Sequence, residues 1–525
     1  MELGFTRRQF ATGALAVTAG TAAAIAGGAG VASASEKATG SAAGDAKSAL
    51  ADASVSADYA GRVSKTMDCD VVVVGAGMSG LAAAVEALND GASVIVLESE
   101  EQPGGNGNVT SCVMGVGSKM QQALGIDVTP AQIITAEMQT FNYAADGVRW
   151  ANLIAASSDN IDWIQEQGAT LCGVVDKYQG AGTFETAHEW TENDGRDGGT
   201  CYVQPMVVRV ADLGGTLLTS APARQIIMRD GSAAGVYAEA SDGVVQVNAK
   251  AVILATGGYA DNDDLLASRG YDVSQTAVFG VPGHNGDGIT MALAAGAKSW
   301  LDDSSLMEYP MNPAIGRESS AFSRLPTSVF VNGNGARIGD ENASVAVPAR
   351  AALMVRSQEI SYALFNQDVI DAALDGKDDA KKTFEDGVSS GAIFKADTLE
   401  GLAQAAGIDG DALVETMGRY NDDAKAGEDT LFGKDASALV PMENGPFYLS
   451  QNNGIYFLVT IGGIDTTETC EVRAEDGGVI PGLYAVGVDG VENYRGCYTI
   501  DVPGSCNANN IYTGRVAAQR AVATL

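Results

Sequence analysis

The sequence is poor in side chains that bind metals. Its 525 residues include only two histidines and seven cysteines. The cysteines form neither a CxxCH motif for haem nor a CxxC pair of the kind that holds zinc or an iron–sulfur cluster. We therefore expect no metal site and interpret most cysteines as small core residues. Cys497 and Cys506, which flank a late glycine turn, are the pair to test for a disulfide.

Positive charge is also scarce. Lysine and arginine number 32 against 66 aspartates and glutamates, which gives a formal net charge of −34 at pH 7. This excess disfavours nucleic acid and anionic lipid as partners and keeps an exported protein soluble. A solvated acidic surface is the default explanation, although the same charge would favour docking of a basic electron carrier.

Long apolar runs are absent beyond the first 34 residues. The sequence TRRQF at 6–10 is a twin-arginine motif, a weakly apolar Ala- and Gly-rich run follows, and ASA at 32–34 is a small-residue cleavage site. We expect a signal peptide over 1–34, with an uncleaved anchor as the alternative. The mature protein would then work outside the cytoplasmic membrane without stable insertion. Because this route carries folded proteins, the cofactor would be tightly held.

Residues 35–66 are rich in Ala, Ser, Gly and Lys and show no periodicity, which is typical of a flexible linker. The remaining length suits two or three domains.

The most informative stretch is VVVVGAGMSGLAAA at 71–84. It predicts a buried strand, a GxGxxG turn and a helix whose N-terminal N–H groups favour a pyrophosphate. The next strand, SVIVLES, ends at a carboxylate that suits the ribose hydroxyls of an adenine nucleotide. An empty doubly wound fold is the alternative. The candidate nucleotide-binding residues here are Gly75, Gly77, Met78, Ser79, Gly80, Glu98 and Ser99.

Later glycine-rich turns continue this unit. A PGGN loop follows Glu98, a β-meander with DG turns runs into AVILATGGY, and an NGDGI turn opens a helix. Near the end, PGLYAVG is a strand that runs into glycine, and PGS opens a terminal helix. These turns supply the candidates Gly104, Gly105, Asn106, Thr256, Gly257, Gly258, Asp287, Gly487, Gly504 and Ser505.

These five motifs, in this order, resemble the FAD-binding flavoproteins of the fumarate reductase and succinate dehydrogenase superfamily, from about residue 68 to the end. The resemblance implies an α/β fold: a split Rossmann-like FAD-binding domain with a β-meander, over 67–304 and 446–525, and an inserted α+β capping domain over 305–445. It implies FAD, which we expect to be non-covalent because no histidine lies near the PGGN loop. The start of the terminal helix would stabilise negative charge on reduced flavin, unless it is an ordinary buried helix start.

The chain departs from the dicarboxylate-reducing members of that superfamily. Tyr309 and Val459 stand where they have histidines, and Asp501 lies close to the position of their carboxylate-binding arginine. The dicarboxylate enzymes have an arginine that acts as the acid, and an ungapped match places Val345 at its position. Arg350 could take the role of that arginine only if the loop is aligned with a shift of five residues. Arg324 matches an arginine of their proton relay, but its acidic neighbour is Ala321. These departures disfavour fumarate, and they resemble exported reductases such as the urocanate and cardiac glycoside enzymes.

We therefore expect an exported reductase that transfers hydride from flavin N5 to an activated C=C bond of an enone, enoate ester or lactone. The candidate catalytic residues are Tyr309, Arg324, Arg350, Tyr498 and Asp501. Their alternatives are a core tyrosine, a surface arginine in the cap and a helix cap at Asp501. Electrons would come from an external donor such as a membrane-linked multihaem cytochrome. A dehydrogenase similar to ketosteroid Δ1-dehydrogenases, a non-catalytic electron shuttle and a fumarate reductase remain alternatives.

Overall fold

The computed structural model describes residues 58–178, 182–191, 198–342 and 348–525. The expected signal peptide, most of the expected linker and Val345 lie outside the described residues. No helix in the described part of the chain has both the length and the apolar character needed to span a bilayer.

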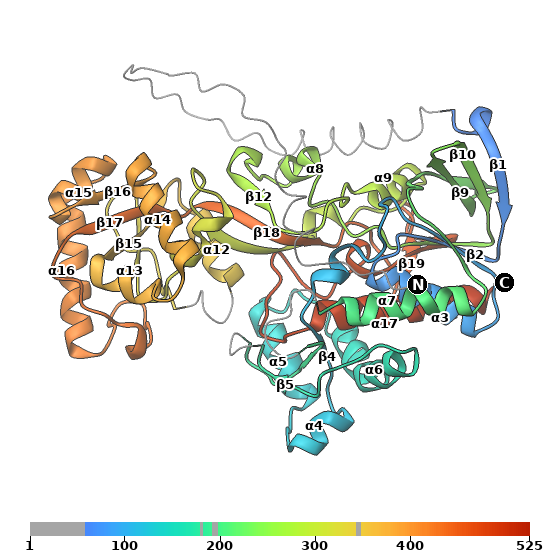
Figure 1. Ribbon diagram of the computed structural model, residues 1–525, viewed down its shortest axis with the longest axis horizontal. Coiled ribbons are helices and arrows are strands. Elements are labelled where there is room, and N and C mark those ends of the chain that lie inside the picture. Colours follow the sequence, from blue (N-terminus) through green and yellow to red (C-terminus); the bar gives the residue numbers. More distant parts are fainter. Residues whose placement is uncertain (1–57, 179–181, 192–197, 343–347) are drawn as a thin grey trace. The chain divides into compact units, whose positions relative to one another are not determined.

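A six-stranded sheet has the strand order β19-β20-β11-β2-β3-β7, and Figure 1 labels its strands β2 and β19 on the right-hand side of the view. All neighbours pair in parallel except β19 and β20. Every residue of β2, β3 and β11 is buried, because helices or loops cover both faces of a parallel sheet, and this explains their unbroken apolar sequences. The strands are β2 (Val71–Val74), β3 (Val94–Leu97), β7 (Thr216–Leu218), β11 (Ala251–Leu254), β19 (Glu471–Arg473) and β20 (Val479–Ala485).

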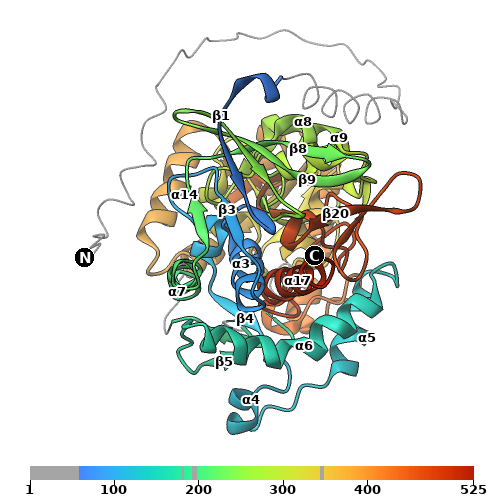
Figure 2. The same cartoon turned by 90° about the vertical axis from the view of Figure 1, so that its right-hand side faces the viewer.

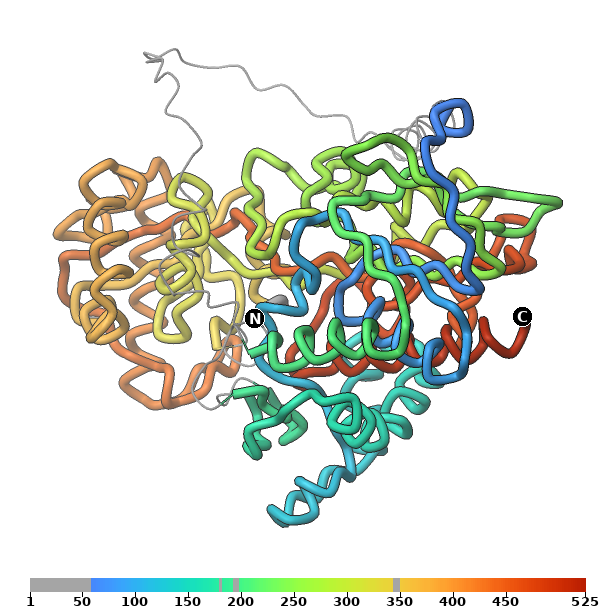
Figure 3. The backbone as a smooth tube through the Cα atoms, turned by 45° about the vertical axis from the view of Figure 1, so that its right-hand side comes forward, coloured from blue at the N-terminus to red at the C-terminus, as the bar shows by residue number. Residues whose placement is uncertain are grey.

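Three helices pack side by side against this sheet: α3 (Met78–Asn89), α7 (Thr200–Asp212) and α17 (Ser505–Val522) (Figure 2). The approach of α17 to α3 is close, since a Cβ on Gly514 would lie 2.4 Å from the backbone oxygen of Ser79. Figure 3 shows the red C-terminal segment running among blue and green segments, so that the two ends of the described chain build one domain.

The predicted meander is present as β8 (Ala223–Arg229), β9 (Ser232–Ala240) and β10 (Gly243–Asn248), and it leads into β11. A fourth strand, β1 (Val63–Asp68), pairs in parallel with β10 after the short helix η1 (Ala60–Arg62). The flexible linker predicted for 35–66 is therefore wrong at its C-terminal end. Residues 63–66 form a strand because the edge of β10 offers backbone hydrogen-bond partners to them. Their composition alone does not indicate this pairing.

A smaller subdomain, which was not predicted from the sequence, follows the PGGN loop. It contains a three-stranded sheet of β4 (Cys112–Met114), β6 (Ala187–Glu189) and β5 (Val175–Asp176). Its helices are α4 (Lys119–Leu124), α5 (Pro130–Thr140) and α6 (Gly147–Glu166). The indole N–H of Trp150 on α6 donates to the backbone oxygen of Asn493 at 2.8 Å, which ties this subdomain to the C-terminal segment.

The cap is built on a four-stranded sheet with the order β14-β15-β17-β16. Two long strands, β13 and β18, pair antiparallel beside it, and β12 (Thr276–Val278) adds to β18 in parallel. The predicted cap ends at residue 445, but strand β17, which follows that residue, also belongs to it. We assign β17 to the cap because it pairs with β15 and β16. The strands are β13 (Ser305–Met311), β14 (Val329–Asn332), β15 (Ser361–Asn366), β16 (Ile393–Ala396), β17 (Phe447–Gln451) and β18 (Gly454–Ile461).

Helices cover this sheet and connect it to the central one. In the cap they are α10 (Ser320–Ser323), α12 (Pro348–Arg356), α13 (Gln367–Ala373), α14 (Asp378–Ser390), α15 (Leu399–Ala406) and α16 (Gly410–Ala426). Before the cap lie α8 (Asp263–Ser268) and α9 (Asp287–Ala294). The remaining short helices are η2 (Gly105–Val109), η3 (Val273–Gln275), η4 (Leu301–Asp303), η5 (Arg317–Ser319), η6 (Ala436–Ala438) and η7 (Gly487–Asp489).

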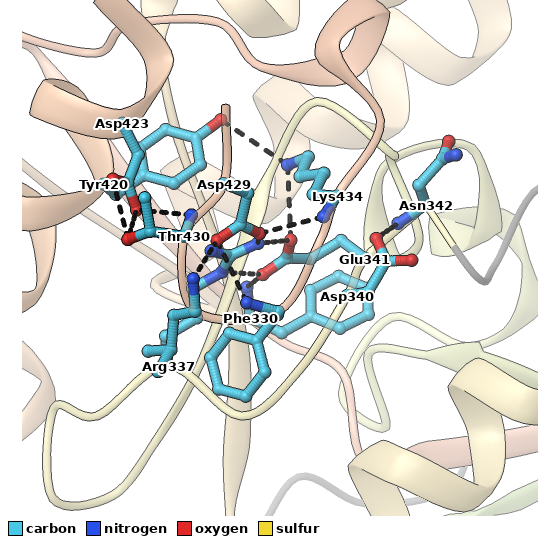
Figure 4. A network of polar contacts seen from close by, with 12 residues as sticks. Phe330, Arg337, Asp340, Glu341, Asn342, Tyr420, Asp423, Asp429, Thr430 and Lys434 are labelled. Atoms are coloured by element: carbon cyan, nitrogen blue, oxygen red, sulfur yellow. Dashed lines mark hydrogen bonds and ion pairs between the residues drawn. The ribbon is translucent and has the colours of Figure 1, made fainter. Parts of the chain in front are cut away.

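A buried ionic network holds the cap together (Figure 4). Arg337 contacts the carboxylates of both Glu341 and Asp429 at 2.8 Å, and Lys434 Nζ lies 3.3 Å from Glu341. Lys434 also donates to the backbone oxygen of Ser328 at 2.8 Å. Because each buried charge has an opposite charge and hydrogen bonds, the network joins the loop after β14 to the loop after α16 without leaving an isolated charge in the core.

Candidate active site

A cavity of about 740 Å³ begins at the carboxyl ends of β2, β3 and β11 and continues to β13 and β18. Ligands of open α/β sheets bind at this edge. The cavity wall includes residues from the GxGxxG turn, the PGGN loop, the TGG turn and the start of α17. Motifs that are up to 430 residues apart along the chain therefore meet around one space, within the size range of cofactor and ligand sites.

The glycines of the first turn have different roles. Gly75 has φ of +105°, and a Cβ there would lie 2.2 Å from the backbone oxygen of Ala255. A Cβ on Gly80 would lie 1.9 Å from the oxygen of Gly75, and Gly80 does not line the cavity, so that it serves packing instead. A Cβ on Gly77 would meet its nearest atom only at 3.9 Å. The protein itself leaves this space open beside the N-terminus of α3, where Met78 and Ser79 also line the wall.

Glu98 lies at the end of β3 in the cavity wall and is 8% exposed. Its carboxylate accepts hydrogen bonds from the backbone N–H groups of Ala76 at 2.8 Å and Glu100 at 2.9 Å, and from Ser99 Oγ at 3.2 Å. A carboxylate has about four lone-pair sites, so that capacity for a ribose hydroxyl remains. Ser99 and Asp287 lie in the same wall, and Asp287 forms an ion pair with Arg224 at 3.1 Å.

The middle of the cavity is lined by Gly104, Gly105, Asn106, Thr256 and Gly257. Asp489 of η7 fixes the TGG turn. It accepts from the backbone N–H of Thr256 at 2.5 Å and of Gly258 at 2.9 Å, and burial raises the pKa of its carboxyl. Gly258 and Gly487, two of the candidates, lie behind the wall instead of in it.

No histidine is near the PGGN loop in the sequence, but one lies close to it in the folded structure, so that this expectation is wrong. The ring of His284 lines the cavity, and its Nε2 is 3.9 Å from the position of a Cβ on Gly105. The 178 residues between them in sequence hide this approach. His284 Nδ1 lies 2.8 Å from the backbone oxygen of Val281, which fixes the orientation of the ring.

The start of α17 forms the next part of the wall. Gly504 lines it with φ of +78°, and a Cβ there would lie 2.4 Å from the backbone nitrogen of Met114. Ser505 is fully buried behind it and accepts from Tyr494 Oη at 2.9 Å. Cys506 lines the cavity. Both Cys506 and Cys497 are free thiols, so that the disulfide considered for this pair is absent.

Asn510, one turn further along α17, also lines the cavity. Its Oδ1 is buried and has no hydrogen-bond partner among the residues that the structure describes. An orphaned polar atom in a cavity wall is the sign of an interaction that a ligand completes.

Aromatic rings line the far end of the cavity. Tyr309 on β13 and Tyr456 on β18 stack with ring centroids 4.8 Å apart and an angle of 11° between the planes. The guanidinium of Arg324 lies 5.2 Å from the centroid of Tyr309. Tyr498 also lines the wall, and burial raises its pKa well above the ordinary value, so that its hydroxyl keeps its proton.

A second arginine, Arg317, lines the same end of the cavity. Its guanidinium lies 4.7 Å from the centroid of Phe279, and its Nε pairs with Glu318 at 3.2 Å. The far end therefore holds Arg317 in addition to the predicted Arg324, and the charge of Arg317 is balanced by the adjacent carboxylate of Glu318.

The structure does not place two catalytic candidates, Arg350 and Asp501, in this wall. They form an ion pair at 3.0 Å and line a separate opening of about 400 Å³ with Thr140 and Thr183. The reason is the backbone of the segment before α17, where Tyr498 and Ile500 face the cavity and Asp501 faces away. Arg350 is 43% exposed and belongs to α12 of the cap.

Several residues that line the cavity were not predicted from the sequence, above all Tyr456, Arg317, Phe279 and Asn510. Tyr456 lies in an ordinary apolar strand, GIYFLVTI, with no local motif. Only the antiparallel register of β13 and β18, which sets Tyr456 opposite Tyr309, brings it to the site.

These features fit FAD. The open space at Gly77 and the N-terminus of α3 suit its pyrophosphate, Glu98 suits its ribose, and the start of α17 with Asn510 suits the polar edge of a flavin. The aromatic residues Tyr309 and Tyr456 line another part of the same cavity.

The comparisons with known proteins agree with this cavity. The model of a family described as "FAD binding domain" matches residues 70–499. A vinyl phenol reductase of Lactiplantibacillus plantarum is 30% identical over 489 residues, which cover 86% of this chain and 96% of that protein. A fumarate reductase (cytochrome) of Shewanella frigidimarina is 28% identical over 422 residues, which cover 80% and 71%.

Among solved structures, a 3-ketosteroid-Δ4-(5α)-dehydrogenase of Rhodococcus jostii RHA1 matches with a TM-score of 0.68 at 22% identity, over 87% of this chain and 97% of that one. At this identity the match shows a shared fold. The predicted α/β fold, the superfamily and FAD as cofactor are confirmed.

Proposed function

The chain belongs to the FAD binding domain family and is an FAD-dependent oxidoreductase, and we propose that it is an exported reductase of conjugated C=C bonds. The substrate would be planar and would carry its C=C bond next to an electron-withdrawing or aromatic group. The observation that carries this proposal is the stacked pair Tyr309 and Tyr456, with Arg324 on one face, at the free end of the cavity. The name of the vinyl phenol reductase relative supports the same substrate type.

In this proposal the bound FAD supplies a hydride, and the side chains of the chain do the rest. The flat surface of the tyrosine pair would bind a conjugated substrate through stacking, which is worth roughly 0.5–1.5 kcal/mol for an aromatic pair. Arg324 would hold the carbonyl or other group on which negative charge develops. Tyr498, whose burial keeps the hydroxyl protonated, would give a proton to the α-carbon.

A small dicarboxylate suits this wall poorly. Recognition of a dianion needs several unbalanced cations, whereas Arg317 pairs with Glu318 and Arg350 pairs with Asp501 outside the cavity. Val459 lines the wall where the dicarboxylate enzymes have a histidine and offers no hydrogen bond. These contacts favour the enone and enoate class over fumarate.

The dehydrogenase alternative runs the same chemistry in reverse and needs a tyrosinate to remove a proton. Burial raises the pKa of Tyr498 well above its ordinary value, so that the resting side chain is the protonated acid that reduction uses and not the base that a dehydrogenase needs. A non-catalytic shuttle would have no use for a stacked aromatic wall beyond the flavin. Export and an external electron donor remain part of the proposal, supported by the twin-arginine sequence and by the net charge of −34.

The test is anaerobic reduction of the purified FAD-loaded protein with an artificial donor, followed by addition of enones, enoate esters, vinyl phenols or fumarate. Oxidation of the flavin, followed by its absorbance, reports transfer to the substrate. We expect a conjugated aromatic or carbonyl alkene to oxidise the flavin at least 10-fold faster than fumarate. The proposal would be contradicted if fumarate oxidised the flavin fastest. It would also be contradicted if none of the alkenes oxidised the flavin.

A further inference from the structure

The proposed mechanism does not use His284, a side chain of the cavity wall that is 7% exposed. It lies between β12 and α9, and its ring reaches the place where the TGG turn meets the PGGN loop. A Cβ on Gly257 would lie 2.9 Å from Nε2, and a Cβ on Gly105 would lie 3.9 Å from the same atom. Because both positions are glycine, the edge of the imidazole fits between two turns of the nucleotide-binding part of the cavity.

Hydrogen bonds hold this ring in one orientation. Nδ1 lies 2.8 Å from the backbone oxygen of Val281, which can only accept, so that Nδ1 carries a proton. The backbone N–H of Val281 donates to Asn106 Oδ1 of the PGGN loop at 2.8 Å. Asp261 Oδ2 accepts from the backbone N–H groups of Gly283 at 3.0 Å and His284 at 2.9 Å. No described residue forms a hydrogen bond with Nε2, which is therefore the nitrogen that remains for a ligand.

Positive charge is scarce in the cavity wall. Among the described residues that line it, the basic side chains are Arg317, Arg324 and His284. The guanidinium groups of the two arginines lie over the rings of Phe279 and Tyr309, at the aromatic end. In the described wall, His284 is thus the basic side chain that lies at the nucleotide-binding turns.

Carboxylates surround the ring on several elements. Those that line this part of the cavity are Glu98, Glu100 and Asp287, and Asp287 pairs with Arg224. Asp261 Oδ2 lies 4.0 Å from Nδ1. Behind the TGG turn, Asp489 accepts from the backbone N–H groups on either side of Gly257. A protonated ring therefore has a counter-ion at Asp261, on the side of Nδ1, while Nε2 is directed toward the two glycine turns.

The space that suits the pyrophosphate of FAD borders the same loop. Gly77, where this space is open, forms an isolated β-bridge with Gly104, and the N–H of Gly104 donates to the backbone oxygen of Ala76 at 2.9 Å. Gly105, which lies beside Nε2, is the next residue. The N-terminus of α3 offers N–H groups and a partial positive charge there, but the pyrophosphate carries two full negative charges.

We propose that His284 binds the pyrophosphate of FAD as an imidazolium, with Nε2–H donating to a phosphate oxygen while Nδ1–H stays on Val281. A charge-assisted hydrogen bond of this kind is stronger than one between neutral groups. The inference concerns the cofactor and is independent of the substrate that we propose. It makes the retention of FAD sensitive to pH.

The direction of this pH dependence follows from the proton. A free imidazole loses its proton as pH rises between about 5 and 8, whereas the pyrophosphate of FAD keeps both charges over this range. The complex holds the proton on His284, so that binding takes up a proton wherever the flavin-free protein has lost it. The affinity for FAD should therefore fall as pH rises.

The test is the dissociation constant of FAD for the full chain, measured by fluorescence titration after removal of the bound flavin, from about pH 6 to about pH 8.5 at fixed ionic strength. His284→Asn keeps an N–H in the place of Nδ1 and removes Nε2, and His284→Gln offers a neutral amide near the place of Nε2. The matched control is Lys65→Gln, which removes one positive charge at an exposed position of β1 outside the cavity wall.

In wild type and in Lys65→Gln, the dissociation constant should rise about 3- to 30-fold across this pH range. At about pH 6, each His284 variant should raise it about 10- to 100-fold, because a hydrogen bond to a charged group is lost. At about pH 8.5 the variants should differ much less from wild type. Equal affinity of wild type and both variants at the low pH, or one pH dependence in all proteins, would overturn the proposal.

Two further probes identify the part of FAD that His284 contacts. ADP-ribose has the same pyrophosphate and no flavin, and adenosine has neither. His284→Asn should weaken binding of ADP-ribose by a factor similar to that for FAD and leave binding of adenosine unchanged. A loss confined to FAD would assign the ring to the flavin and overturn the pyrophosphate contact.

A measurement on wild type alone covers the case in which the variants do not fold, which their circular dichroism would show. Calorimetric titration with FAD at about pH 7.5, in two buffers of different ionisation enthalpy, gives the number of protons taken up. We expect a net uptake, and binding without uptake would overturn the proposal. None of these outcomes bears on the reduction of alkenes, which the flavin-oxidation assay tests separately.

Discussion

At the scale of single residues, the site separates side chains that shape the backbone from side chains that face a ligand. Gly75, Gly80 and Gly504 are required by neighbouring atoms of the protein, whereas the space at Gly77 is open toward the cavity. Glu98 and Asn510 present polar atoms to the same space. A motif match treats all of these positions alike, but the packing distances distinguish them.

Glu98→Ala should weaken FAD binding. The substitution removes the carboxylate that we assign to the ribose and leaves the N–H groups of Ala76 and Glu100 without their acceptor. Since a hydrogen bond to a charged group contributes about 1.5–3 kcal/mol, the dissociation constant should rise about 10- to 100-fold. Flavin fluorescence released on dialysis measures it. Glu101→Ala, at an exposed neighbour outside the wall, is the control, and equal retention in both variants would refute the assignment.

Tyr456→Leu should raise KM for an aromatic alkene about 2- to 10-fold with a smaller effect on kcat, because it removes the stacked ring and not a reacting group. Tyr456→Phe keeps the ring and should restore KM. The measurement is initial rate against substrate concentration under an artificial donor. An unchanged KM in the leucine variant would mean that substrate binds elsewhere.

At the scale of elements, the close contact of α3 and α17 couples the two separate parts of the nucleotide-binding domain. Gly514 makes this approach possible, and the β20–β11 pairing fixes the same two segments in the sheet. The N-terminus of each helix lies at the cavity wall. Packing between these two helices therefore positions two helix dipoles for one ligand.

Gly514→Ala should destabilise the protein by about 1–3 kcal/mol, because its Cβ would lie 2.4 Å from a backbone oxygen and force α17 away from α3. Gly418→Ala is the matched control. It lies exposed in α16 with nothing within 4 Å of the new Cβ, and it should stabilise by roughly 0.5–1 kcal/mol. Urea unfolding of both variants decides, and a neutral Gly514→Ala would show that the interface adjusts freely.

At the scale of the whole molecule, the net charge of −34 sets how the protein meets its partners. Such a charge attracts cations over a distance comparable with the Debye length, about 8 Å at physiological ionic strength. The sequence offers no haem motif for internal electron transfer. The external electron donor that we propose would therefore dock more readily if its surface were basic.

Flavin reduction by a cationic donor, such as a viologen radical, should therefore slow down as salt is raised from about 0.01 to 0.5 M, since screening weakens the attraction. Reduction by an anionic donor such as dithionite should accelerate over the same range. Stopped-flow measurement of both rates gives the comparison. The same salt dependence for both donors would show that the acidic surface does not act at the electron-entry point.

The sequence by itself determined the nucleotide-binding framework. Buried parallel strands, glycine turns and helix starts are encoded over stretches of about ten residues, so that β2, α3, β3, the meander, β11 and α17 could be predicted with FAD as their ligand. The tertiary structure alone decided the catalytic end. Tyr456 reaches Tyr309 through the register of two strands about 150 residues apart, and Asp501 turns away from the cavity with Arg350. Local patterns record which element a residue belongs to, but its neighbours across the fold are fixed only by how the elements pack.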